Sequence, residues 1–219
     1  MCTRGGFAST CAAMPDILHA DEALVVIDKP AGLLAVPGRG EDRRDSAWMR
    51  TRALYDDALV VHRLDMATSG LMAFGRGAAA QRGLSMAFER RTVEKRYVAI
   101  VAGNVEAEQG EIDLPLIVDW PNRPLQHVDH ATGKPSLTRW RVLERTARRT
   151  RLELEPVTGR SHQIRVHLLA IGHPIVGDAL YAPPAARDAA PRLLLHACRL
   201  TLPHPVSGER VTFVCPAPF

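Results

Sequence analysis

Short apolar runs, each bounded by glycine, proline or polar turn residues, constrain the fold of this chain most strongly. The run "ALVVID" predicts a strand that ends at Asp28. Residues 137–143 and 151–155 alternate in character, as a half-buried antiparallel pair does. Further strands are predicted at 58–61 and 71–74, in "RYVAIVAG", and in the closing segments "LLLHACRLTL" and "RVTFV". The pattern indicates a core rich in antiparallel strands.

Helical patterns occupy fewer segments. Residues 77–91 repeat apolar side chains at four-residue spacing, which predicts a helix. The segment "DSAWMRTRALY" predicts a second helix, capped by Asp45. The segment "SHQIRVHLLAIG" predicts a third, of about three turns and capped by Ser161. The alanine and proline run at 182–191 predicts a surface loop.

The chain shows no internal repeat and no interior linker. Hydrophobic residues make up 46% of its 219 positions, enough for a substantial core. We therefore expect one α+β domain at 17–219, with a mixed, mainly antiparallel sheet flanked by helices and loops. Residues 1–16 are small and polar without periodicity, so they are expected to form a loose leader, in which Met14 is an alternative start.

Charge favours a phosphate-bearing partner. Lys and Arg number 28 against 24 acidic residues, a net charge of +4, and nearly all the positive charge is arginine. Arginines gather at 39–52, 82–96 and 139–151, which suggests a surface that follows an RNA backbone. No run approaches the roughly 20 apolar residues of a membrane helix, so no membrane partner is expected.

The four cysteines lie near the two ends of the chain without C-x-x-C spacing, a pattern that suits neither a zinc site nor a disulfide framework. No secretory signal pattern is present at the N-terminus. A reducing cytoplasm is the expected location, and we expect a monomer without a protein partner.

The segment "VHRLDMATSG" poses the main chemical question. An aspartate before Thr-Ser-Gly is most often a turn residue, which is one interpretation of Asp65. The other depends on Arg63 and on Arg165 in the later helix, because a carboxylate beside a guanidinium stays ionised and nucleophilic. Such a group can attack a sugar carbon or take a proton.

Two further segments carry candidate groups. Tyr97 begins a strand and is either a core tyrosine or a residue that stacks on a base and exchanges a proton through its hydroxyl. His162 and His167 are five positions apart, unlike the same-face spacing of zinc helices, so no metal site is expected. The segment "DKPAG" lacks the glycines of a phosphate loop, and we expect it to bring Lys29 or Pro30 to the rim of the site.

Six motifs occur in one order: "HRLDMATSG", "KRYVAIVAG", "GKPSLTRW", "GRSHQIRVH", "GHPIVGDALY" and "LLLHACRL". Together they resemble the RluA-type pseudouridine synthases, and the similarity extends from about residue 17 to 219. The segments at 125–130 and 146–150 diverge from the family pattern. Larger relatives carry an N-terminal RNA-binding module of the S4 type, for which this chain has no room.

The resemblance implies a single catalytic domain that isomerises uridine to pseudouridine after flipping the base, without a metal or organic cofactor. It makes Asp65 the catalytic aspartate, Arg165 its ion-pair partner, Tyr97 the residue over the uracil, and Arg63 the side chain that fills the gap. It also implies RNA contacts from His62, Arg160, His162, Lys134 and Lys29, and a pocket lined by Ile164 and Leu195.

The similarity is strongest to family members with two RNA targets, which implies a uridine at the 5′ edge of a tRNA anticodon loop and a uridine of a 23S rRNA stem-loop. A single target stays open, and so does the choice between a covalent C1′ adduct and a glycal. Two other classes stay open on the residues alone: an RNA chaperone without catalysis, and a metal-dependent hydrolase built on His62, His162, His167 and Asp178.

Overall fold

The computed structural model describes residues 14–219, so most of the predicted leader lies outside the described residues. Ten strands form the main sheet: β1 (Asp16–Ala20), β2 (Leu24–Lys29), β3 (Ala58–Val60), β4 (Ser69–Arg76), β5 (Glu94–Ala102), β6 (Gln109–Asp113), β9 (Leu137–Arg145), β10 (Arg149–Pro156), β11 (Leu195–Pro203) and β12 (Arg210–Val214). Strands β7 (Leu116–Val118) and β8 (Gln126–Val128) form a separate hairpin.

The main path through the sheet runs β1-β2-β4-β11-β5-β10-β9-β6, with β3 beside β4 and β12 beside β11. The pair β4 and β11 is parallel and the other pairs are antiparallel. This arrangement confirms the predicted mixed, mainly antiparallel sheet. Strands β9 and β10 pair as their alternating sequences predict.

The helices are α1 (Ala47–Arg52), α2 (Gly77–Glu89), α3 (Gln163–Ala170) and α4 (Pro184–Arg187), with a 3₁₀ turn at Glu41–Arg43. Two predicted caps are wrong. Ser46, not Asp45, accepts the hydrogen bond from Met49 N that caps α1, and α3 begins after His162 rather than at Ser161. The predicted loop at 182–191 contains the short helix α4. None of the helices within 14–219 has the length and apolar character needed to cross a membrane.

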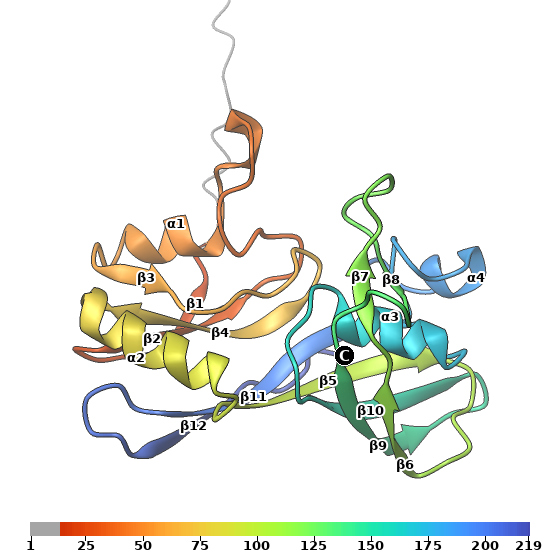
Figure 1. The fold of residues 1–219 in the computed structure, drawn as a ribbon. Coiled ribbons are helices and arrows are strands. Elements are labelled where there is room, and N and C mark those ends of the chain that lie inside the picture. Colours follow the sequence, from red (N-terminus) through yellow and green to blue (C-terminus); the bar gives the residue numbers. More distant parts are fainter. Residues whose placement is uncertain (1–13) are drawn as a thin grey trace, which may run out of the picture.

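Strand β2 places helices on both faces of the sheet because neighbouring side chains of a strand point in opposite directions. Leu24 and Val26 belong to the core cluster that includes α2 residues. Val25 and Ile27 belong to the cluster that includes the first residue of α1. Helices α1 and α2 therefore cover opposite faces of this half of the sheet (Figure 1).

A third core cluster fills the other half of the molecule. Leu152 and Leu154 of β10 pack there with Ile164 and Leu168 of α3. Tyr97 packs against this cluster and also against the cluster beneath α1. The face that carries α1 and α3 therefore has Tyr97 at the seam between its two halves, where the loop before β4 also arrives (Figure 1).

Candidate active site

A cleft of about 840 Å³ opens at this seam. Residues 62–66 line one wall, and residues 156–165 line the opposite wall. Asp65, Tyr97 and Arg165, which are far apart in the sequence, all line it, together with Ile164 and Leu195. The volume lies within the range of small-molecule sites, so the cleft has room for one nucleotide.

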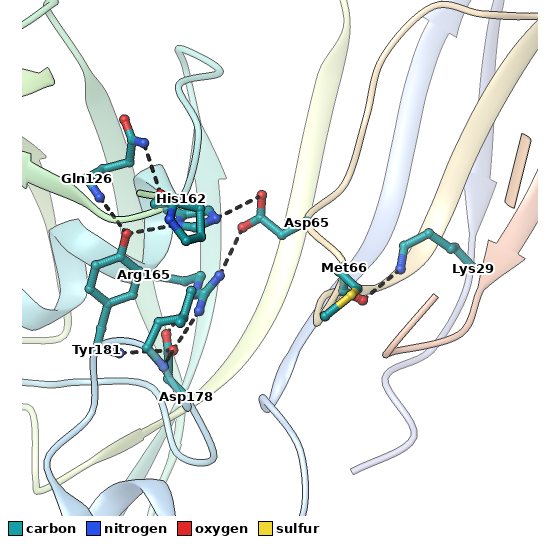
Figure 2. Close-up of polar contacts among 10 residues, drawn as sticks. Lys29, Asp65, Met66, Gln126, His162, Arg165, Asp178 and Tyr181 are labelled. Carbon is teal, nitrogen blue, oxygen red and sulfur yellow. Dashed lines mark hydrogen bonds and ion pairs between the residues drawn. The ribbon is translucent and has the colours of Figure 1, made fainter. Parts of the chain in front are cut away.

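The loop that carries Asp65 is fixed through its backbone. The Met66 carbonyl oxygen accepts hydrogen bonds from Gly32 N at 2.8 Å and from Lys29 Nζ at 3.2 Å. Lys29 also donates to the carbonyl oxygens of Pro30 and Leu33, at 2.9 and 2.8 Å. A fully buried ammonium thus ties the end of β2 to the residue after Asp65, a contact drawn in Figure 2.

The far end of the same loop is also fixed. Ser69 Oγ lies 2.9 Å from His196 Nδ1 and accepts a 2.6 Å hydrogen bond from Arg192. Gly70 has φ of 109°, and a Cβ there would lie 2.4 Å from the carbonyl oxygen of Ala197. The close parallel pairing of β4 and β11 therefore requires glycine at this position.

Arg165 lies between two carboxylates (Figure 2). Its Nε and Nη2 donate to Asp178 at 2.8 and 2.7 Å, while Nη1 lies 3.5 Å from Asp65 Oδ2. Burial disfavours the guanidinium charge, but the hydrogen bonds and charge of Asp178 outweigh burial and raise the pKa of Arg165. Asp178 thus holds a charged guanidinium that faces Asp65.

His162 faces the other oxygen of Asp65. Its Nε2 lies 4.0 Å from Asp65 Oδ1, and its Nδ1 lies 2.7 Å from the hydroxyl of Tyr181. His162 itself precedes α3 in a left-handed conformation, with φ of 54° and ψ of 15°, and this conformation directs its ring into the cleft. Burial, only partly offset by the charge of Asp65, lowers the pKa of His162.

Tyr97 is half-buried on β5 and lines the cleft floor. Burial, reinforced by the charge of Asp65, raises the pKa of its hydroxyl above the ordinary value. A hydroxyl that stays protonated is a poor base, whereas the ring remains available for stacking on a planar ligand.

The rim of the cleft is cationic. The lining includes the exposed residues Arg63, Arg91 and Arg160. The β7–β8 hairpin stands next to α3 (Figure 1), and Pro124 in its loop lines the cleft. The same loop carries the exposed Trp120, whose ring centroid lies 4.0 Å from the guanidinium carbon of Arg123. Arginines beside an exposed aromatic ring are typical of surfaces that bind single-stranded or looped nucleic acid.

One predicted RNA contact, that of Lys29, is corrected by the structure, and that of Lys134 stays a prediction. Lys29 does not reach the rim: its side chain is buried and its ammonium is engaged by three carbonyl oxygens. Lys134 is exposed but is not part of the cleft lining. Neither the burial of Lys29 nor the position of Lys134 follows from a local sequence pattern.

His62 lines the cleft, but its side chain has a structural contact. Its Nε2 accepts a 2.9 Å hydrogen bond from Ala73 N, and its ring stacks on Phe88 with centroids 4.5 Å apart. Burial lowers the pKa of His62 to about 3, so the ring is neutral at physiological pH and adds no charge for RNA.

Candidate metal ligands of the hydrolase hypothesis are already engaged in other contacts. His167 contacts Thr138 Oγ1 and the Leu114 carbonyl, both at 3.0 Å, and Asp178 holds Arg165. Among the described residues, Asp28, His196 and Cys215 place potential ligand atoms within 4.8 Å of one another. Both ring nitrogens of His196 are already hydrogen-bonded, to Ser69 Oγ and to the Cys215 carbonyl, so this cluster lacks a free imidazole lone pair.

The sequence offered Asp178 only as a metal ligand of the hydrolase hypothesis, and it assigned no role to Tyr181. Both lie in the segment "GHPIVGDALY", whose position beside Asp65 depends on long-range folding. The segment follows α3 and returns to pack Tyr181 beneath Arg165, with the guanidinium 5.0 Å from its ring. The place of this segment among the six ordered motifs indicates that it belongs to the site. It does not indicate which of its side chains reach Asp65.

Comparisons with known proteins show which family the chain belongs to. A family model described as RNA pseudouridylate synthase matches residues 23–170. The dual-specificity RNA pseudouridine synthase RluA of Escherichia coli K12 is 52% identical over 204 residues, which cover 93% of each chain. The protein of the same name from Pasteurella multocida is 49% identical over 205 residues, covering 93% of this chain and 94% of its own.

A solved structure agrees as well. Human RNA Pseudouridylate Synthase Domain Containing 1 superposes with a TM-score of 0.78 at 28% identity, covering 94% of this chain and 84% of its own. The family match and the similar relatives identify an enzyme that modifies RNA. The chain belongs to the RluA-type RNA pseudouridine synthases, as its ordered motifs predict.

Proposed function

We propose that Asp65 drives the isomerisation of a uridine that is flipped out of an RNA loop into the cleft. The observation that carries this proposal is the position of the Asp65 carboxylate, which lies in the cleft with Arg165 Nη1 at 3.5 Å and shares the cleft with Tyr97. Its side chain is 27% exposed, so an incoming ribose has access to it.

The isomerisation conserves atoms. The N1–C1′ bond breaks with its electron pair on uracil, the detached base turns, and C5 forms the new bond to C1′. C5 then loses its proton and N1 gains one. Because the uracil anion is delocalised, one carboxylate suffices where most glycosidases use two. Asp65 either adds to C1′ or removes the 2′ proton, and both routes need the ionised carboxylate beside Arg165.

The neighbouring residues have separate roles in this proposal. Tyr97 covers the face of the uracil ring. A base role for Tyr97 in removing the C5 proton requires Asp65 to accept the phenolic proton in the same step. Arg63 fills the gap that the flipped nucleotide leaves, which offsets the few kcal/mol that unstacking costs. Arg160 and His162 face the RNA from the opposite wall, and Ile164 and Leu195 exclude water from the ring.

The proposed substrates are the uridine at the 5′ edge of a tRNA anticodon loop and a uridine in a 23S rRNA stem-loop. The name of the Escherichia coli relative, a dual-specificity enzyme, supports two targets. The cationic rim supports recognition of backbone and loop shape. We propose that one copy of residues 17–219 suffices as the catalytic domain, because residues within this range line both walls of the cleft.

The test is pseudouridine mapping in tRNA and 23S rRNA from a deletion strain, complemented with the wild-type gene or with Asp65→Asn. The wild-type gene should restore a modification in each RNA, and Asp65→Asn should restore neither. Restoration in a single RNA class would contradict dual specificity. Equal complementation by Asp65→Asn would favour the RNA chaperone.

A further inference from the structure

Tyr181 lies behind the cleft, beyond the residues that line it, yet it contacts both groups that face Asp65. Its hydroxyl lies 2.7 Å from His162 Nδ1, and the two rings meet edge to face with centroids 5.6 Å apart. Its ring also packs against the guanidinium of Arg165. Figure 2 shows these side chains converging on Asp65 from one side.

One of the two hydrogen bonds of Tyr181 has a fixed direction. The backbone N–H of Gln126 donates to the Tyr181 oxygen at 2.9 Å, and an N–H group has no other role. Within residues 14–219 the other polar partner of the hydroxyl is His162 Nδ1, to which we assign the single hydroxyl proton of Tyr181. Burial raises the pKa of Tyr181 to about 12, so this proton is present throughout the neutral range.

An imidazole that accepts at Nδ1 carries its proton at Nε2 when it is neutral. We infer that Tyr181 is a positioning residue that fixes His162 in its neutral Nε2–H tautomer and so keeps an uncharged donor opposite Asp65 Oδ1 during catalysis. This inference rests on the proposed role of Asp65 and names two residues that support it.

A neutral His162 gives the two oxygens of the Asp65 carboxylate different electrostatic surroundings. Oδ2 faces the permanent charge of Arg165, whereas Oδ1 faces a neutral N–H at 4.0 Å, so a ribose oxygen that approaches from the side can contact both atoms. A protonated His162 would add a second cation and make the carboxylate a weaker nucleophile and base. The Tyr181 hydroxyl opposes that protonation because its proton already occupies the Nδ1 lone pair.

The charges around His162 define how a pH test should be read. Asp65 faces the ring from the loop before β4, Arg165 from α3, and Asp178 and Tyr181 from the segment after Gly177. Gln126 of β8, which holds the Tyr181 oxygen, is neutral. Tyr181→Phe changes only the hydroxyl among these groups.

The experiment measures single-turnover rate and RNA affinity against pH for the wild type, Tyr181→Phe, His162→Gln and the double variant. Tyr55→Phe is the matched control, since Tyr55 packs against Arg76 and does not line the cleft. Tyr181→Phe should slow turnover by up to about tenfold, the value of one neutral hydrogen bond, with unchanged RNA affinity. The acid limb of its rate profile should move to higher pH, because His162 gains a proton more easily.

His162→Gln keeps an N–H donor without a titrating ring, so the acid limb should not move further when Tyr181→Phe is added to it. A Tyr181→Phe profile with the wild-type pH dependence would overturn the inference, and so would an undiminished shift in the double variant. If the wild type itself forms no pseudouridine, the proposed function fails instead, which keeps the two failures distinct.

Discussion

The guanidinium of Arg165 is clamped by Asp178 through two hydrogen bonds of 2.8 and 2.7 Å, and it is this clamp that aims the third nitrogen at Asp65. Both side chains of the clamp are almost fully buried, with 4% and 1% exposed. Each charge therefore depends on the other, because a buried ion without its partner costs several kcal/mol.

Asp178→Asn should lower both stability and activity. The change leaves the Arg165 charge uncompensated, and we expect a loss of about 3 kcal/mol in the free energy of unfolding, measured by urea denaturation. Asp188→Asn is the matched control, since Asp188 forms an exposed, solvent-screened pair with Arg187 and should leave stability nearly unchanged. Equal effects of the two variants would contradict the clamp.

The burial of Lys29 predicts how the stability of the protein depends on pH. Burial lowers the pKa of Lys29 to about 8, below the 10.5 of an unfolded chain, so the unfolded state binds more protons between these values. The stability contribution of Lys29 should therefore rise with pH from about 8 to 10.5. Urea denaturation at pH 7.5 and 9.5 should show a rise in the wild type relative to Lys29→Met. Parallel curves for the two proteins would place Lys29 in solvent.

The arginines of the cleft rim should act through phosphate. Replacing Arg160 with alanine should weaken RNA binding and reduce the slope of log affinity against log salt by about 0.7. Arg210 lies on β12 and forms an exposed ion pair with Glu94 of β5, so Arg210→Ala should leave the slope unchanged. Arg63→Ala should reduce turnover more than affinity, as a residue that fills the gap requires. A uniform effect of all three would argue against a defined rim.

Gly70→Ala tests the close approach of β4 and β11. The added Cβ meets a backbone oxygen at 2.4 Å with φ of 109°, so the strands must separate. We expect a loss of a few kcal/mol, comparable to other severe backbone effects. Gly83→Ala, in α2 with no atom within 4 Å of its new Cβ, should instead stabilise the protein by about 0.5–1 kcal/mol. Thermal unfolding of both variants gives the comparison.

The sequence predicts strands better than it predicts their surroundings. Alternation in β9 and β10 reflects a local property, the period of two along a strand, so those strands follow directly from the residues. The caps do not: Asp45 and Ser46 are both good N-cap residues, and the one that caps α1 is decided by where the chain enters the helix. Asp45 instead pairs with Arg50.

The candidate site shows the same division. The ordered motifs indicate that Asp65, Tyr97 and Arg165 act together, and the cleft brings them together. They do not indicate that Lys29 is buried, because a lysine usually stays in solvent and its burial here requires three carbonyl oxygens, those of Pro30 and Leu33 nearby and that of Met66 in a distant segment. Tyr181 and the pairing of Asp178 with Arg165 were missed for the same reason, since both depend on contacts with α3.

The most direct test of the account is tritium release from RNA labelled at C5 of uridine, with purified wild type, Asp65→Asn and Asp188→Asn under single-turnover conditions. The account predicts release by the wild type and by Asp188→Asn at equal rates, and none by Asp65→Asn, which should still bind the RNA with wild-type affinity. Tritium release by a correctly folded Asp65→Asn protein would contradict the assignment of Asp65 as the catalytic group.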